Sequence, residues 1–329
     1  MEREEVRRIL LKVLWERLLV QQQGNKKLEL SLSSPFLNDF WHFRKRETTV
    51  LQVFKRTFQA ILRRLGIYHR LRASSLYDLY WRMLDRSIIE DRCKEVAFYH
   101  NLLEGRRKSD LIFDVGANQG SKTAIFLRLG ARVVAVEPDE ANQQILKEMF
   151  LRRRFVPKPV HIIGKALGER CAVETMWIDE PGSAKNTLSQ KWVQTLRNDD
   201  ERFGHRLNFK QRKEVETTTL ENLIVDHGLP IYIKIDVEGF ELNVLRGLRH
   251  PIPYLSFEVN LPEFRSEGLQ SVELLGALAI RGKFNYTADC RRGLALQEWL
   301  DASEFAQILQ RCTESSIEVF WKSSEPFRA

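Results

Sequence analysis

The sequence predicts an α/β protein built on a doubly wound sheet, in which mostly parallel strands alternate with helices. The first observation is an apolar run at residues 111–113 that is followed by a glycine turn and a helix-like segment. The second is the β-branched run at residues 132–136, and the third is the alternation of strand-like and helix-like segments that continues to residue 321. A chain of 329 residues with 43% apolar and 29% charged residues can bury a large core.

The first strand, turn and helix form the half of a βαβ unit that usually carries a ligand. Residues 111–113 have the composition of a buried strand, and Asp114 is expected to end it. Gly116 and Gly120 bracket the turn before a helix expected over residues 121–129. Glycine lets a ligand approach the main chain closely, and the start of the helix offers free N–H groups. The turn is therefore the first candidate binding site.

The second strand supplies an acidic residue at the position typical of a ribose-binding carboxylate. Glu137 follows the strand at residues 132–136 and lies 17 residues after Gly120. The glycine spacing is D-x-G-x-x-x-G and differs from the G-x-G-x-x-G of dinucleotide sites. This spacing favours an adenosine cofactor without phosphates, such as S-adenosylmethionine, over a nicotinamide dinucleotide.

The remaining elements are expected in a regular order. Further helices are predicted over residues 139–151, 220–227, 241–248 and 271–280, and further strands over residues 160–163, 171–178, 216–220, 231–235, 254–259, 284–288 and 317–321. Thr219 is expected to cap the helix at 220–227. Residues 181–209 are polar and without apolar periodicity, which is typical either of a binding loop or of a plain surface loop.

Five sequence motifs connect the chain to a known family. These motifs are FDVGANQG, VVAVEPD, ALGE, VETTTLENL and IKIDVEGFELNVLRGL, and they fall between residues 110 and 261. Together they resemble the FkbM family of S-adenosylmethionine-dependent methyltransferases. The resemblance implies a seven-stranded, Rossmann-like class I methyltransferase sheet that ends in an antiparallel pair of strands. It also implies S-adenosylmethionine as cofactor and a hydroxyl oxygen as the methyl acceptor.

The resemblance also assigns cofactor-binding residues. The methionine end of the cofactor is expected at Asp114, Gly116, Asn118 and Gly120, the ribose at Glu137, and the adenine near Ala166. Ser183, Asn186 and Thr187 weakly resemble a small polar motif of the family. The alternative for Asp114 and Glu137 is that they only cap helices or complement helix dipoles.

Carboxyl groups are expected to gather at one rim of the sheet, because ligands bind beyond the carboxyl ends of the strands. The residues concerned are Asp114, Glu137, Asp236, Glu238 and Glu258. Five acids suit a cofactor whose sulfonium and ammonium groups are both positive.

Asp236 and Glu238 are the strongest catalytic candidates, because a carboxylate can accept the proton of an alcohol nucleophile. Two alternatives stay open for Asp236, namely a Mg²⁺ site completed by Glu238 and Glu258, or a cap for the following helix. His205 in the polar region is a second candidate base, and Lys234 is assigned no role.

The first 109 residues differ from the rest in charge. Residues 1–109 carry a net charge of +10 and residues 110–329 a net charge of −2, which predicts a basic helical extension before the catalytic domain. Helices are expected over residues 1–23, 49–65 and 75–103. The extension could cover the core or a second subunit, lie on an anionic membrane surface, or bind nucleic acid.

The composition and the spacing of the cysteines indicate where in the cell the protein is found. The sequence has no apolar run near 20 residues, its start lacks the features of a secretory signal, and its four cysteines are widely spaced. These features predict free thiols and a cytoplasmic protein. The expected activity is methylation of a hydroxyl on a small molecule, a sugar or a lipid-linked acceptor. The rival functions are a nicotinamide-dependent oxidoreductase and a non-catalytic cofactor-binding adaptor, and the oligomeric state stays open.

Overall fold

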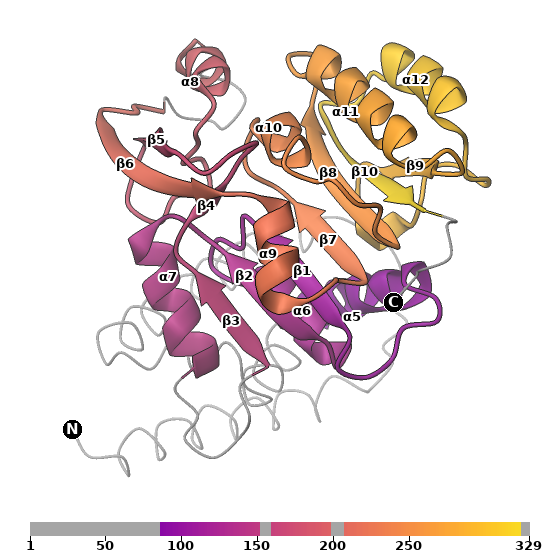
Figure 1. Ribbon diagram of the computed structural model, residues 1–329, viewed down its shortest axis with the longest axis horizontal. Helices are drawn as coiled ribbons and strands as arrows, with labels where there is room; N and C mark the ends of the chain where they lie inside the picture. The colour runs from indigo at the N-terminus through magenta and orange to yellow at the C-terminus, as the bar shows by residue number, and fades with distance from the viewer. Residues whose placement is uncertain (1–85, 152–158, 199–206, 324–329) are drawn as a thin grey trace, which may run out of the picture. The chain divides into compact units, whose positions relative to one another are not determined.

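The computed structural model describes residues 86–151, 159–198 and 207–323 (Figure 1). The chain divides into two compact units, residues 1–61 and 62–329, and all the described residues belong to the second unit. The predicted helices at residues 1–23 and 49–65 and the candidate base His205 lie outside the described residues.

A seven-stranded sheet forms the centre of the described unit. Its order is β3-β2-β1-β7-β8-β10-β9. The bounds are β1 Leu111–Val115, β2 Arg132–Val136, β3 Val160–Ile163, β7 Tyr232–Ile235, β8 Tyr254–Asn260, β9 Lys283–Thr287 and β10 Ser316–Lys322. The first five strands in this order pair in parallel, and β10 runs antiparallel to both β8 and β9. The predicted doubly wound sheet and its antiparallel final pair are confirmed.

The chain reverses its direction of travel across the sheet between β1 and β7. It builds β1, β2 and β3 outward to one edge, and then returns to place β7 on the other side of β1. Ligands in open α/β sheets bind at such a switch point, beyond the carboxyl ends of the strands. The fold therefore predicts a ligand site at the loops that follow β1, β2 and β7.

A small second sheet lies beside the main one, with its strands in the spatial order β4-β6-β5. Its strands are β4 Ala166–Leu167, β5 Val173–Ile178 and β6 Gln211–Thr218. Strand β5 matches the strand predicted over residues 171–178, whereas β6 begins five residues earlier than residue 216. This sheet places Ala166 beside the switch point described above.

One face of the main sheet is covered by α5 (Arg86–Leu102) and α6 (Ser121–Arg128). Tyr99 of α5, Phe126 of α6 and Tyr232 of β7 are fully buried there. The rings of Tyr99 and Phe126 meet edge to face with centroids 5.2 Å apart, a favoured aromatic geometry. Helix α5 precedes the expected domain boundary at residue 109 and nonetheless packs on the sheet. The boundary itself stays a prediction.

The opposite face is covered by four helices. They are α9 Leu220–His227, α10 Glu241–Leu245, α11 Arg265–Leu278 and α12 Ala302–Arg311, and all contribute to one apolar core. In Figure 1, α9 lies over the middle of the sheet, and α10, α11 and α12 lie in the upper part of the view. Strand β7 shows how the two layers share a strand. Ile233 and Ile235 join this core, while Tyr232 and Lys234 point to the other face because side chains alternate along a strand.

Helix α7 (Glu140–Leu146) follows β2 and continues as a π-helical turn over Lys147–Leu151. Together the two segments cover most of the helix predicted over residues 139–151. Asp139 caps α7, since its side chain accepts a hydrogen bond from the N–H of Ala141. Thr219 caps α9 in the same way through Asn222, as the sequence predicts.

The prediction that residues 181–209 are irregular is wrong in part. The segment contains helix α8 (Gln190–Arg197), capped by the side chain of Ser189. Trp192, Val193 and Leu196 are buried on one side of this helix. Three apolar residues within two turns of a polar stretch are too few to produce a clear periodic signal.

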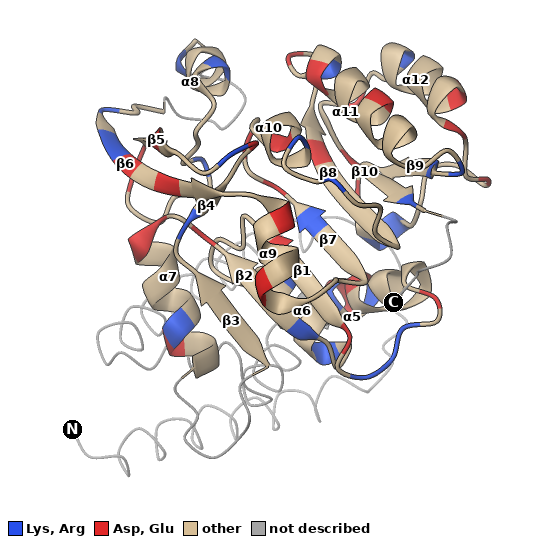
Figure 2. Ribbon diagram, viewed as in Figure 1, with Lys and Arg blue, Asp and Glu red and all other residues tan. Residues whose placement is uncertain are grey.

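Acidic and basic residues are interspersed along the described elements (Figure 2). No helix in the described part of the chain is long and apolar enough to span a bilayer.

Candidate active site

The glycine turn after β1 is packed against the end of β7. Asp114 is buried within β1, which continues to Val115, and so it does not end the strand as expected. Gly116 has φ +80°, and a Cβ atom there would lie 1.8 Å from the backbone oxygen of Asp236. No residue with a side chain fits this contact. The turn therefore joins the predicted cofactor loop to the predicted catalytic residue.

Glu137 holds the loop that follows β1. The backbone N–H of Asn118 donates to its Oε2 at 2.7 Å, and the N–H of Asp139 donates to its Oε1 at 2.8 Å. Burial raises the pKa of Glu137 to about 7, although these two N–H groups favour the charged form. Its carboxyl group is thus held rigidly at the tip of β2.

A pocket of about 150 Å³ lies between the ends of β1, β2 and β7. Six of the nine predicted site residues line it, namely Gly116, Asn118, Glu137, Ala166, Asp236 and Glu238. Asp114 is buried in β1 and does not line the pocket, and Gly120 lines a neighbouring cavity. The structure therefore brings together residues from four separate motifs.

Two residues that line this pocket have a buried amide oxygen without a hydrogen-bond partner among the described residues. The two atoms are Oδ1 of Asn118 and Oδ1 of Asn142. Buried polar atoms in native proteins nearly always find a partner. S-adenosylmethionine offers the missing donors in its amino groups and ribose hydroxyls, so the residues present fit this cofactor. The sequence reasoning did not single out Asn142, whose position on α7 becomes meaningful only in three dimensions.

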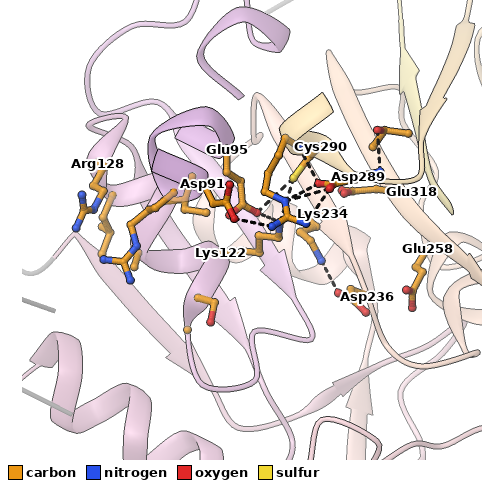
Figure 3. A pocket seen from close by; sticks show the side chains of 18 of the residues that line it. Asp91, Glu95, Lys122, Arg128, Lys234, Asp236, Glu258, Asp289, Cys290 and Glu318 are labelled. Carbon is orange, nitrogen blue, oxygen red and sulfur yellow. Dashed lines mark hydrogen bonds and ion pairs between the residues drawn. The ribbon is translucent and has the colours of Figure 1, made fainter. Parts of the chain in front are cut away.

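Asp236 follows β7 and is paired with a buried lysine. Nζ of Lys234 lies 2.7 Å from Oδ2 of Asp236 (Figure 3). Burial on its own would raise the pKa of Asp236, but the Lys234 ammonium group outweighs it and holds the pKa below the usual range. The sequence assigned Lys234 no role. The alternation of β7 places its side chain on the same face as that of Asp236.

Three carboxyl groups converge where β7 and β8 end. Oxygen atoms of Asp236, Glu238 and Glu258 all lie within 4.8 Å of one another. Burial, together with the charges of Asp236 and Glu238, raises the pKa of Glu258 well above its ordinary value.

Protein donors already engage each member of this cluster. Besides the pairing of Asp236 described above, Glu238 accepts from Lys185 and Trp192, and Glu258 accepts from Ser316 and Asn260. The geometry by itself therefore assigns no metal to the cluster.

A larger cavity, of about 950 Å³, adjoins the cofactor pocket. Asp236 lines both spaces, and it is the predicted site residue that they share. The end of the cavity near Asp236 is polar, with Lys122, Lys234, Glu258 and Glu318 among its lining residues (Figure 3). A residue between a cofactor pocket and a second, polar cavity is placed to act on two ligands.

The sheet order, the switch point and the pocket define a class I S-adenosylmethionine-dependent methyltransferase. The family model of the methyltransferase FkbM domain matches residues 114–284, which is just over half of the chain. The chain therefore belongs to the FkbM methyltransferase family, and its cofactor is S-adenosylmethionine. This result decides against the nicotinamide-dependent alternative.

The chain is also similar to solved methyltransferase structures at low sequence identity. One is a TehB-like methyltransferase from Corynebacterium glutamicum, with 9% identity, a TM-score of 0.36, and coverage of 70% of this chain and 88% of that chain. Another is precorrin-6y C5,15-methyltransferase from Geobacter metallireducens, with 8% identity, a TM-score of 0.33, and coverage of 71% and 87%. A third is the plantazolicin methyltransferase BpumL in complex with SAH, with 11% identity, a TM-score of 0.35, and coverage of 82% and 100%. No curated protein matches the sequence.

Proposed function

We propose that the enzyme transfers the methyl group of S-adenosylmethionine to a hydroxyl oxygen, with Asp236 as the general base. The observation that carries this proposal is the position of Asp236, which lines both the cofactor pocket and the adjoining polar cavity. The acceptor then occupies the larger cavity. We place it among small molecules, sugars and lipid-linked acceptors that present a hydroxyl group.

The cofactor residues take the roles that the family resemblance implies. Asp114, Gly116, Asn118 and Gly120 hold the methionine end, with Asp114 acting from beneath the turn, while Glu137 binds the ribose. The adenine lies near Ala166. Bound S-adenosylmethionine supplies an electrophilic methyl group on a positive sulfur.

The chain's own part in the reaction is to align the acceptor and to take a proton. A new bond forms between the acceptor oxygen and the methyl carbon while the carbon–sulfur bond breaks, and the hydroxyl proton passes to Asp236. The products are a methyl ether and S-adenosylhomocysteine. Lys234 keeps Asp236 ionised and correctly placed. Because both carboxylate oxygens of Glu238 accept hydrogen bonds from other side chains, we assign Glu238 a holding role, and His205 stays a prediction.

The acceptor class is tested by incubating the protein with S-adenosylmethionine and a set of hydroxylated, aminated and carbon-nucleophile acceptors. We expect S-adenosylhomocysteine to be released with hydroxylated acceptors, and mass spectrometry with NMR to locate the new methyl group on oxygen. Methylation of carbon or nitrogen alone would contradict the proposal.

The affinity for S-adenosylhomocysteine should fall as the pH drops through about 7. Glu137 has a pKa of about 7 in the folded protein, and its charged form accepts hydrogen bonds from ribose hydroxyls better than its protonated form does. The ligand thus favours deprotonated Glu137, and affinity is full above about pH 7 and lost below it. Calorimetry between pH 5.5 and 8.5 measures this dependence. The Glu137→Gln variant should bind S-adenosylhomocysteine weakly, with an affinity that does not depend on pH. If the variant instead showed the same pH dependence as the natural protein, Glu137 would not be the ribose-binding residue.

We further propose that the enzyme works in the cytoplasm and contacts anionic membranes through residues 1–23. All four cysteines are free thiols, which is usual in a reducing compartment.

The full chain should sediment with phosphatidylserine vesicles more than a chain that begins at residue 24 does, and added salt should weaken this binding. Equal sedimentation of the two chains would reject the membrane contact.

A further inference from the structure

Residues 180–186 form a loop along one side of the cofactor pocket, and we call this segment the strap. Ser183, Ala184 and Asn186 of the strap line the pocket. At its end, Thr187 is attached to β5 by two backbone hydrogen bonds with Trp177, of 2.8 and 3.1 Å. The two ends of the strap are therefore held close together, and the residues between them form a short closed loop.

The strap is tied to the β2 side of the pocket through Asp139. Oδ2 of Asp139 accepts hydrogen bonds from the N–H of Gly182 at 2.9 Å and from Nδ2 of Asn186 at 2.6 Å. The N–H of Asp139 in turn donates to Glu137, the proposed ribose-binding residue. One buried residue thus connects the strap, through its carboxylate, to Glu137, through its backbone N–H.

The strap is tied to the β7 side of the pocket through Glu238. Nζ of Lys185 lies 3.0 Å from Oε1 of Glu238, and the hydroxyl of Thr187 donates to the backbone oxygen of Glu238 at 2.7 Å. Trp192 of α8 binds the other carboxylate oxygen at 3.1 Å. The Lys185 pair is the charged contact of the strap on this side, and it is partly exposed to solvent.

The space under the closed strap is small for the cofactor. Its volume is about 150 Å³, whereas pockets for ligands of this size measure roughly 300 to 1,000 Å³. Most of the other lining residues belong to strands β1, β2, β4 and β5, to helix α7, and to the loops that follow β1, β2 and β7. The strap is the boundary held mainly by side-chain contacts.

We propose that the strap must release its side-chain ties to admit S-adenosylmethionine and to let S-adenosylhomocysteine leave. In this proposal Lys185 and Asp139 are positioning residues that set the rate of cofactor exchange. The inference rests on the assignment of the pocket to the cofactor, but it does not depend on the nature of the acceptor.

The first test weakens one tie. Lys185→Gln removes the charge that pairs with Glu238, and stopped-flow fluorescence measures the association and dissociation of S-adenosylhomocysteine. Both rate constants should rise about tenfold, as expected for the loss of a partly buried charge-assisted contact, while the dissociation constant changes less. Lys191→Gln is the matched control, because Lys191 of α8 pairs with Glu267 outside the strap. Unchanged rate constants in Lys185→Gln would show that the Lys185–Glu238 pair does not control cofactor exchange.

The second test locks the strap shut. A Cβ atom on Gly182 would lie 3.6 Å from Cβ of Ala141 on α7, within the roughly 3.5–4.5 Å found across disulfides. The Gly182→Cys/Ala141→Cys variant should bind S-adenosylhomocysteine when reduced and lose at least about tenfold in association rate when oxidised. Reductant should restore the rate. Each single variant, treated with the same oxidant, controls for pairing with the native cysteines.

The outcomes separate the two proposals. Equal association rates for the oxidised and reduced double variant would show that the strap need not move, and would overturn this inference while leaving the pocket assignment intact. If neither the natural protein nor the reduced variant binds S-adenosylhomocysteine, the pocket assignment fails and the strap proposal fails with it.

Discussion

Replacing Gly116 with alanine should abolish cofactor binding and destabilise the fold. The new Cβ atom would lie 1.8 Å from the backbone oxygen of Asp236, so the turn after β1 and the end of β7 would have to separate. The left-handed backbone of Gly116 adds a further penalty for any residue with a side chain. Together we expect a loss of at least about 3 kcal/mol in the free energy of unfolding. Urea titration measures the stability, and calorimetry measures binding of S-adenosylhomocysteine.

Gly105→Ala provides a matched control for this variant. Gly105 also has a left-handed backbone, with φ +76°, but a Cβ atom there would meet no other atom within 4 Å. This variant should lose only about 1 kcal/mol and keep its affinity for S-adenosylhomocysteine. If the two variants proved equally stable and bound S-adenosylhomocysteine equally well, the turn at Gly116 would not pack closely against the end of β7.

Asp236→Asn should lower the rate constant of methyl transfer by about 10² to 10⁴, the usual effect of removing a general base. The asparagine oxygen can still accept a hydrogen bond from Lys234, so the fold should be kept. Asp114 and Glu318 also remain near that buried ammonium group. The affinity for S-adenosylhomocysteine, whose sulfur is uncharged, should change little. Single-turnover assays with an acceptor identified as above measure the chemical step.

Asp289→Asn is the control for charge in the acceptor cavity. Asp289 lines the same cavity as Asp236, but its carboxylate is already bound by Arg291 at 2.8 Å. Its removal should leave the rate constant of the chemical step close to that of the natural enzyme. If both variants lowered the rate constant of methyl transfer equally, the rate would depend on the overall charge of the cavity, and Asp236 would not be the base.

The local signals in the sequence predicted the parts of the site that a few neighbouring residues determine. The glycine turn and Glu137 were found because a fixed spacing of about 20 residues connects a βαβ unit to its ribose carboxylate. Asp236 was found because it directly follows a buried strand. In each case the relevant information lies within one strand and the loop beside it.

The contacts that hold the strap could not be predicted in this way. Lys185 and Glu238 are 53 residues apart, and Asp139 and Asn186 are 47 residues apart. Neither pair has a sequence pattern, because each depends on how the two sheets are placed in space. The sequence could identify the residues as polar but could not match one with another.

Helix α12 shows a different kind of omission. Asp301 and Glu304 form a complete capping box at its start, and Phe305 and Leu309 are buried on one side. This signal was present in the sequence, whereas the short α8 offers only three apolar residues in a polar region. Helix α8 therefore needs tertiary contacts to be recognised, whereas α12 has a local signal that the sequence prediction did not use.

The most direct test of the cofactor and acceptor assignments is a crystal structure with S-adenosylhomocysteine bound. The ligand should lie beside the strap, with its ribose at Glu137 and its sulfur facing the larger cavity that Asp236 also lines. A structure in which the ligand binds elsewhere, or in which its sulfur faces away from that cavity, would contradict the account.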